Sequence, residues 1–251
     1  MKKYLIAGNW KMNLTVDQSI EFTRKLISAL KKIEKNRTVM IAPPFTSLYT
    51  ISNLIKGSEI ILGAQNINDN SSGAYTGEIS ADMLKNCGVS YVIIGHSERR
   101  HIYGEDDSLI NKKILFSLKN DLFPILCVGE TISEREANKV ELVIDTQITN
   151  GLKDVTPENM AKLVIAYEPV WAIGTGKTAT PEIAQQVHSF IRKKVESLYG
   201  KSVSDNLIIQ YGGSVKDNNV DELMAMPDIN GALVGGASLQ LESFERIVRF
   251  K

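Results

Sequence analysis

Eight short apolar segments recur from one end of the chain to the other, and this repeat restricts the fold more than any other feature. Each is three to six residues long and apolar at successive positions, as expected for a parallel strand covered on both faces. The segments are Tyr4–Ala7, Val39–Ala42, Ile60–Ala64, Tyr91–Ile94, Phe123–Val128, Leu163–Tyr167, Leu207–Tyr211 and Ala232–Val234.

The stretches between these segments have helical periodicity. Apolar residues repeat every fourth position at Ile110, Ile114 and Leu118. A longer stripe keeps one face through four turns and consists of Ile183, Val187, Ile191, Val195 and Leu198. Residues 20–31 and 239–250 are further helix candidates. Strands that alternate with helices indicate a parallel sheet built from βα units.

Eight βα units in 251 residues match the usual size of a (β/α)8 barrel. We therefore predict an α/β protein with one barrel domain spanning residues 1–251. An open, doubly wound sheet of eight strands is the alternative, and the spacing of the segments along the whole chain favours the barrel.

Composition excludes several classes of partner. The formal net charge is zero and no long run of like charge occurs, so neither a nucleic acid nor an anionic membrane is indicated as a partner. The apolar run at the N-terminus is too short for a signal peptide, and no segment approaches the length of a membrane span. Cys87 and Cys127 both lie in or beside apolar runs, which is typical of reduced core residues in a cytoplasmic protein.

Polar residues and glycines follow most of the predicted strands. In a barrel the carboxyl ends of all strands meet at one face, where barrel enzymes have their active sites. These residues are therefore predicted to converge, and they are Asn9, Lys11, Gln65, Asn66, His96, Ser97, Glu98, Glu130, Glu168, Gly212, Gly213, Ser214, Gly235 and Gly236.

Glu168 ends the sixth segment and precedes Pro169, which keeps Glu168 out of the helical region. The loop of small residues from 172 to 179 leads to Thr180-Pro181-Glu182, a helix start with an N-cap, a first-turn proline and an acid. A carboxylate at a strand end before such a loop suits a base beneath a mobile lid. An ordinary strand-loop-helix connection explains this stretch equally well.

Two other side chains suit an anionic substrate. Asn9 and Lys11 are two positions apart, so in an extended segment both point into the barrel mouth, and Lys11 supplies a positive charge. A solvated surface lysine is the alternative, but the large apolar side chains on both sides, Trp10 and Met12, argue against it. His96 stands at a predicted helix start, where the helix dipole disfavours the imidazolium. A neutral imidazole there can donate a hydrogen bond to a carbonyl oxygen, although a capping or core histidine fits as well.

The pairs Gly212-Gly213 and Gly235-Gly236 each stand between a strand and a helix. Glycine lets the backbone N–H groups approach an anion closely, and the loops after strands 7 and 8 are the usual phosphate site of barrel enzymes. One such pair would indicate only a tight turn, whereas two favour a phosphate site. Gly174 offers a further N–H donor.

Two other motifs fail. The stretch from Gly174 to Ala179 contains Gly-Lys-Thr, but Trp171 stands where a P-loop needs its first glycine. A dinucleotide site would need an acid at the end of a second strand, and Glu196 lies within a helical pattern instead. A metal site is disfavoured because His96 and His101 are five residues apart.

Six motifs together resemble the triosephosphate isomerase family over the whole chain. They are 8–13 (GNWKMN), 95–100 (GHSERR), 127–130 (CVGE), 166–177 (AYEPVWAIGTGK), 211–215 (YGGSV) and 233–238 (LVGGAS). The resemblance implies an isomerase that interconverts dihydroxyacetone phosphate and glyceraldehyde 3-phosphate in glycolysis and gluconeogenesis, without metal or cofactor.

The resemblance also implies roles for individual residues. Glu168 would be the base, His96 the electrophile, and Lys11, with Asn9 beside it, the positive group at the phosphate. The backbone N–H groups expected to bind the phosphate are those of Gly174, Ser214, Gly235 and Gly236.

Further positions of the family pattern would support the base and the lid. Ile173 and Leu233 would press on Glu168, and Ser97 would hold it while the lid is open. Tyr211 and Glu130 would hold the closed lid through Ala179 and Trp171, respectively, and Glu98 would pair with Lys11. A homodimer is implied too, with the loop 68–77 docked into the second subunit and Thr76 near its site.

Two other functions are compatible with a phosphate-binding barrel. A Schiff-base aldolase or lyase needs a lysine pointing inward from mid-strand, but the one lysine at the sixth segment, Lys162, stands at its beginning. A non-catalytic phosphosugar-binding barrel has no need of both Glu168 and His96 at its mouth.

Overall fold

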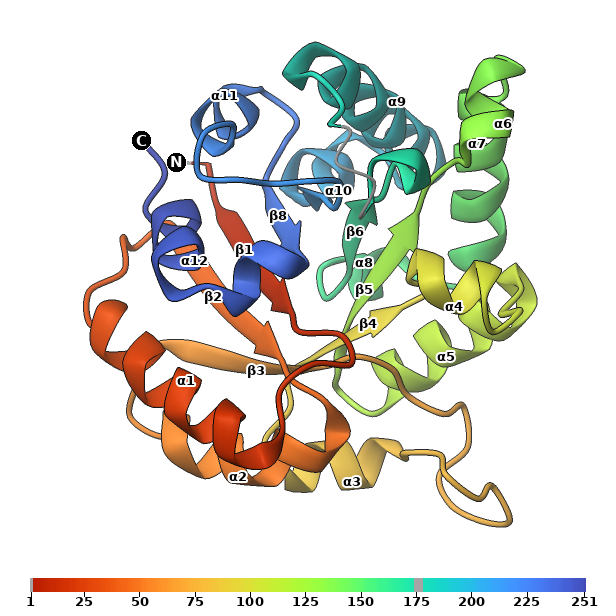
Figure 1. Ribbon diagram of the computed structural model, residues 1–251. Helices are drawn as coiled ribbons and strands as arrows, with labels where there is room; N and C mark the ends of the chain where they lie inside the picture. The colour runs from red at the N-terminus through yellow and green to blue at the C-terminus, as the bar shows by residue number, and fades with distance from the viewer. Residues whose placement is uncertain (1, 174–177) are drawn as a thin grey trace.

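The computed structural model describes residues 2–173 and 178–251 and contains a closed barrel of eight parallel strands in the order β1 to β8 (Figure 1). The register runs from Tyr4 opposite Arg37 to the closing pair of Leu5 and Gly231. The strands are β1 Tyr4–Asn9, β2 Arg37–Ala42, β3 Ile60–Ala64, β4 Tyr91–Ile94, β5 Phe123–Val128, β6 Val164–Tyr167, β7 Ile208–Tyr211 and β8 Gly231–Val234. The predicted barrel is confirmed, and the open sheet is excluded.

Helices surround the barrel and cover its outer face (Figure 1). The α-helices are α1 Val16–Ala29, α2 Leu48–Ile55, α3 Ala81–Asn86, α4 Ser97–His101, α5 Asp107–Lys119, α6 Ile132–Glu136, α7 Val140–Gly151, α8 Pro157–Met160, α9 Pro181–Tyr199, α10 Lys201–Asn206, α11 Val220–Ala225 and α12 Leu241–Val248. The described part of the chain also contains short 3-10 helices, namely η1 Phe45–Ser47, η2 Val170–Ala172 and η3 Gly236–Leu239. None of the described helices is long and apolar enough to cross a membrane.

Two cores explain why the strands are apolar at successive positions. Alternate side chains such as Leu5 and Ala7 fill the barrel interior, and those between them, such as Ile6, pack beneath the helices. The interior is tightly filled, since a Cβ on Gly63 would lie 2.6 Å from the sulfur of Met40. Because glycine has no side chain, the barrel interior beside Gly63 has room for the side chain of Met40.

Helix α9 begins as predicted, with the Thr180 side chain accepting the Ile183 N–H and Pro181 at the first helical position. The predicted apolar stripe is wrong at Leu198, which is 44% exposed. In the same last turn of α9, Tyr199 packs against the core, so the buried face ends on Tyr199 and leaves Leu198 beside it in solvent.

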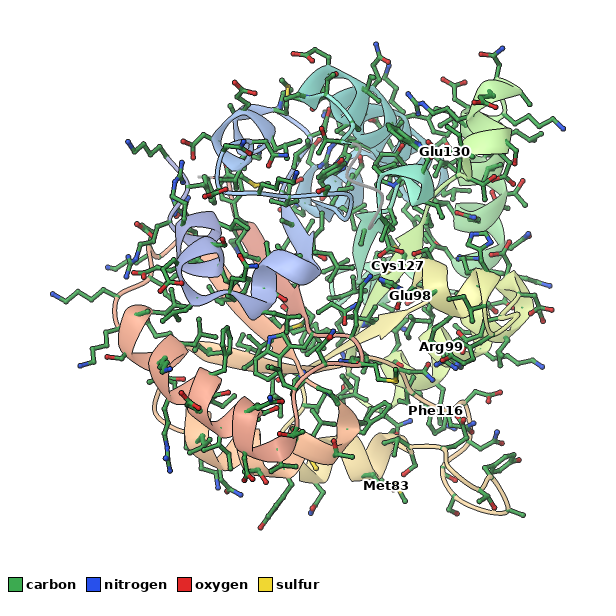
Figure 2. All side chains as sticks on the ribbon, viewed as in Figure 1. Met83, Glu98, Arg99, Phe116, Cys127 and Glu130 are labelled. Atoms are coloured by element: carbon green, nitrogen blue, oxygen red, sulfur yellow. The ribbon has the colours of Figure 1, made fainter. Side chains whose placement is uncertain are left out.

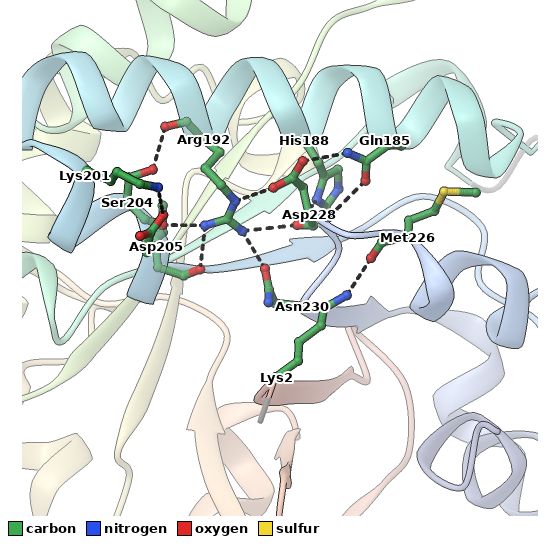
Figure 3. A network of polar contacts seen from close by, with 11 residues as sticks. Lys2, Gln185, His188, Arg192, Lys201, Ser204, Asp205, Met226, Asp228 and Asn230 are labelled. Carbon is green, nitrogen blue, oxygen red and sulfur yellow. Dashed lines mark hydrogen bonds and ion pairs between the residues drawn. The ribbon is translucent and has the colours of Figure 1, made fainter.

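A polar network joins α9 to the amino-terminal rim of the barrel (Figure 3). Arg192 pairs with Asp228, and its guanidinium also donates to the Asn230 side chain at 2.7 Å. His188 lies beside them, fully buried, with its Nδ1 3.2 Å from the Asp228 carbonyl oxygen. Burial lowers the pKa of His188 to about 3.

This pKa predicts that acid destabilises the fold through His188. The unfolded chain binds a proton near pH 6.5 and the folded chain only near pH 3. The stability that the neutral ring contributes is therefore complete above pH 6.5 and is lost as the pH falls below it. Between pH 7 and pH 5 we expect the wild type to lose about 2 kcal/mol more than His188→Gln. Urea unfolding of both proteins at both pH values measures this, and equal losses would contradict it.

Candidate active site

The residues that follow the strands line one cavity of about 420 Å³ at the carboxyl end of the barrel. Eight of the fourteen residues predicted to converge line it, although they are spread over more than 220 positions of the chain. The other six do not line it, and they are Asn9, Gln65, Asn66, Ser97, Glu98 and Glu130. Its lining residues are Lys11, His96, Glu168, Ile173, Gly212, Gly213, Ser214, Val215, Lys216, Asp217, Leu233, Gly235, Gly236, Ala237, Gln240 and Ser243.

Glu168 follows β6 directly and is only 2% exposed. Its Oε2 accepts the backbone N–H of Ser97 at 2.9 Å, and its Oε1 lies 3.1 Å from His96 Nε2. Cys127 is buried beside it, and burial, together with the charge of Glu168, raises the pKa of this thiol well above its usual value. The carboxylate thus rests against two N–H donors and a thiol that stays protonated.

His96 is the N-cap of α4, as its predicted place at a helix start requires. Its Nδ1 accepts the backbone N–H of Glu98 at 3.2 Å, so in this tautomer Nδ1 carries no proton. The ring proton then lies on Nε2, the atom that faces Glu168. His96 therefore caps a helix with one nitrogen and presents an N–H donor to the cavity with the other.

The backbone at Lys11 differs from the predicted extended segment. Its φ is +51°, in the left-handed region, which is uncommon for a residue with a side chain. The Asn9 Oδ1 accepts the Lys11 N–H at 3.0 Å, and the Gln65 amide donates to the Lys11 carbonyl at 2.8 Å. These two bonds hold the turn that brings the ammonium to the cavity.

The side chains of Asn9 and Lys11 consequently have different roles: that of Lys11 lines the cavity, and that of Asn9 holds the backbone. Lys11 lines the cavity and pairs with Glu98 Oε1 at 2.6 Å, as predicted. Asn9 is 5% exposed, holds the Lys11 backbone and is not among the cavity-lining residues. Figure 2 shows Glu98, Cys127 and Glu130 around the carboxyl ends of β4 and β5.

Four glycines form one side of the cavity, at the ends of β7 and β8. A Cβ on Gly212 would lie 2.8 Å from Glu168 Cγ, and one on Gly213 would lie 2.3 Å from the Tyr211 hydroxyl. Close approach therefore requires glycine at both positions. Gly235 and Gly236 stand where η3 begins, and Gly235 lies next to the Lys11 side chain. The predicted donor Gly174 lies outside the described residues.

The predicted lid contacts are present in part. The Trp171 indole donates to Glu130 Oε1 at 2.8 Å, and Ile173 and Leu233 line the cavity together with Glu168. Burial raises the pKa of Tyr211 to about 12, and the nearby backbone N–H of Ala179 lowers this pKa in part. The Tyr211 hydroxyl nevertheless makes no hydrogen bond of standard geometry to a described residue.

Three residues at the site escaped the motif-based prediction. Gln65 was recognised only as a polar residue after a strand, because its partner is a backbone carbonyl that is 54 positions away. Tyr167 and Arg135 both contact the Glu130 carboxylate. Tyr167 belongs to the motif 166–177 but looks like a strand residue, and Arg135 looks like a helix surface residue. The sequence therefore gives no signal for either contact with Glu130.

Lys162, the lysine considered for the Schiff-base alternative, does not line this cavity. Lys162 precedes β6, at the end of that strand opposite to Glu168, and pairs with Asp121 at 2.8 Å. Within residues 2–173 and 178–251, no three His, Cys, Asp or Glu side chains are grouped so that they could hold a metal ion.

Comparison with known proteins identifies the family. The family model for triosephosphate isomerase matches residues 4–251. The chain is 52% identical over 250 residues to the triosephosphate isomerase of Endomicrobium trichonymphae, covering 100% of this chain and 99% of the relative. It is 51% identical to that of Roseiflexus sp. strain RS-1 (100% and 98%) and 52% identical to that of Borreliella burgdorferi strain ZS7 (99% and 98%). The chain therefore belongs to the triosephosphate isomerase family.

Proposed function

We propose that this protein interconverts dihydroxyacetone phosphate and D-glyceraldehyde 3-phosphate by proton transfer through an enediolate, in glycolysis and gluconeogenesis. The observation that carries the proposal is one cavity holding a buried carboxylate, an imidazole N–H donor and an ammonium beside two glycine pairs. The family membership over residues 4–251 supports it independently.

Glu168 is the base in this proposal. Its carboxylate removes a proton from C1 of the ketose, and the C2 carbonyl oxygen takes up the negative charge as the enediolate forms. The proton of the C1 hydroxyl then passes to the C2 oxygen, and the carboxylate returns its own proton to C2, which leaves the carbonyl at C1. To do this it leaves the Ser97 N–H that it contacts here. Ile173 and Leu233 then shield the carboxylate from water, which strengthens it as a base.

His96 and Lys11 stabilise the negative charge that develops on oxygen. The His96 Nε2–H donates to the carbonyl oxygen and then to the enediolate, and the Lys11 ammonium attracts both the phosphate and the enediolate. Such donors stabilise the charge effectively because they are already oriented toward it and need not reorganise at the moment of reaction. Asn9 contributes by holding the Lys11 backbone.

The phosphate is bound by backbone N–H groups of Ser214, Gly235 and Gly236, and of Gly174 in the lid. The lid closes over the site while Glu130 holds Trp171 and Tyr211 holds Ala179. Closure keeps water from the enediolate, which otherwise loses its phosphate. Residues 1–251 act as one domain in the cytoplasm, without metal or cofactor.

The second subunit is a copy of this chain. The loop 68–77 projects from the barrel (Figure 1) and is largely exposed, and Met12 and Ile102 are 96% and 72% exposed. Large exposed apolar side chains mark interaction surfaces. In the proposed dimer this loop docks beside the other cavity and carries Thr76 to it. Sedimentation equilibrium at micromolar concentration should give twice the chain mass, and a monomer would refute the dimer.

A coupled assay with glyceraldehyde 3-phosphate tests the activity directly. We expect fast turnover that a chelator does not change. Covalent trapping of the protein by borohydride in the presence of substrate would instead indicate a Schiff-base enzyme and refute the isomerase. Binding of the substrate without turnover would indicate a phosphosugar-binding protein.

A further inference from the structure

Arg135 lies next to the start of the lid but outside the cavity. It belongs to α6 and is not among the cavity-lining residues. Its Nη1 pairs with Glu130 Oε1 at 2.9 Å, and its guanidinium lies 4.9 Å from the centre of the Trp171 ring. One side chain thus contacts both residues that connect β5 to the lid.

The Glu130 carboxylate needs such a partner. Its side chain is completely buried, and a buried carboxylate is tolerated only when it is paired and hydrogen-bonded. It accepts the Trp171 N–H at 2.8 Å and the Tyr167 hydroxyl at 3.1 and 3.0 Å to its two oxygens. Among the described residues, Arg135 is the one cation paired with it.

The helix α6 holds Arg135 in place. Its N-cap Thr131 and Glu134 form a capping box in which each side chain bonds to the backbone of the other. The Arg135 side chain is 26% exposed, so its charged end is partly withdrawn from water. The planar guanidinium can therefore face the ring of Trp171 while it donates to Glu130.

The segment from Glu168 to Trp171, which joins the base to the lid, is hydrogen-bonded to the end of β5 near Glu130. The Val170 N–H donates to the Glu130 carbonyl at 3.0 Å, and the Glu168 N–H donates to the Val128 carbonyl at 2.7 Å. The segment from Glu168 to Trp171 is thus attached to the end of β5 by two backbone bonds and one side-chain bond. A displaced Glu130 side chain would break the side-chain bond between Trp171 and the end of β5.

We propose that Arg135 is a positioning residue for the lid: it holds the Glu130 carboxylate against the Trp171 indole and so determines where the lid begins relative to Glu168. This inference rests on the proposed isomerase function. Without the guanidinium, the buried carboxylate reorients toward water and the indole loses both its acceptor and its cation. The closed lid is then populated less, so the chemical step slows and the enediolate meets water more often.

The experiment compares Arg135→Gln and Arg135→Lys with the wild type. Arg246→Gln is the matched control, because Arg246 also forms a partly exposed ion pair, with Asp221 at 2.6 Å, and does not line the cavity. We expect Arg135→Gln to lower kcat about tenfold with little change in KM, the size of effect typical of a lost charged hydrogen bond. Inorganic phosphate released per isomerised triose should rise by about the same factor. Arg135→Lys keeps the charge but not the planar group, so we expect about a threefold loss.

Fluorescence provides a readout that does not depend on activity. The chain has two tryptophans, and Trp10 is fully buried, so the difference between each protein and its Trp171→Phe counterpart reports on Trp171. Its emission should move to longer wavelength in Arg135→Gln and stay unchanged in Arg246→Gln.

The proposal is overturned if Arg135→Gln keeps the wild-type phosphate release and Trp171 emission, or if its kcat falls no more than that of Arg246→Gln. If Arg135→Gln does not fold, Arg135→Lys tests the proposal instead. Wild-type values of kcat, phosphate release and Trp171 emission in Arg135→Lys would then overturn it. A wild type without isomerase activity would refute the proposed function alone, because the Trp171 emission still tests the contact.

Discussion

Replacing Glu168 with glutamine is expected to lower kcat by about three orders of magnitude or more, because general-base catalysis typically contributes 10²–10⁴-fold. The amide has nearly the same size as the carboxylate. The Ser97 and His96 N–H groups contact different carboxylate oxygens, at 2.9 and 3.1 Å, so the single amide oxygen can accept one of the two. The change therefore removes the base while leaving the shape of the site intact.

Two measurements make this result specific to the base. Exchange of the substrate C1 hydrogen with deuterium from the solvent should decrease in parallel with kcat, whereas inhibition by inorganic phosphate should persist. Glu158→Gln is the matched control, since this exposed carboxylate belongs to α8 and lies away from the cavity. Near-wild-type turnover of Glu168→Gln would show that another group removes the proton.

Replacing Lys11 with methionine is expected to lower kcat/KM by about 10³-fold, at the upper end of the effect of removing one preorganised electrostatic group. Two causes add up. The variant lacks the charge that attracts the phosphate and the enediolate, and it leaves Glu98, its partner at 2.6 Å, as an unpaired negative charge that repels them. Both KM and kcat should change, because the ammonium interacts with the substrate before and during the reaction.

The double variant Lys11→Met/Glu98→Gln separates these causes. It should recover part of the loss in KM, because the repulsion is gone, but not the loss in kcat. Lys162→Met is the control for removing a lysine charge, since its ammonium pairs with Asp121 at the opposite end of β6. A Lys11→Met enzyme with a kcat/KM within about threefold of wild type would contradict the assigned role.

The motifs predicted the location of the cavity well because the fold converts sequence order into position. Once eight strands close into a barrel, the residue after each strand lies at the same end, whatever its distance in sequence. Glu168, His96 and Lys11 therefore share one cavity. The alternation of apolar segments and helical stretches was sufficient for the fold, since strands covered on both faces have continuous apolar sequences.

Contacts between side chains and distant backbone groups were not predictable in the same way. The left-handed turn at Lys11 needs the Gln65 amide, and the Glu130 carboxylate needs the hydroxyl of Tyr167 and the guanidinium of Arg135. None of these residues differs in type from an ordinary strand or surface residue. The exposed Leu198 likewise follows the helical stripe, but in its turn Tyr199 is the residue that packs against the core.

The sequence by itself determined the barrel, the family and the residues at the mouth, because hydrophobic periodicity and short motifs are local properties of the chain. Only the tertiary structure decided the tautomer of His96, the turn at Lys11 and the partners of Glu130. These depend on hydrogen bonds between groups brought together by barrel closure, and the direction of a lone pair or an N–H bond at 3 Å is not encoded in the identity of any single residue.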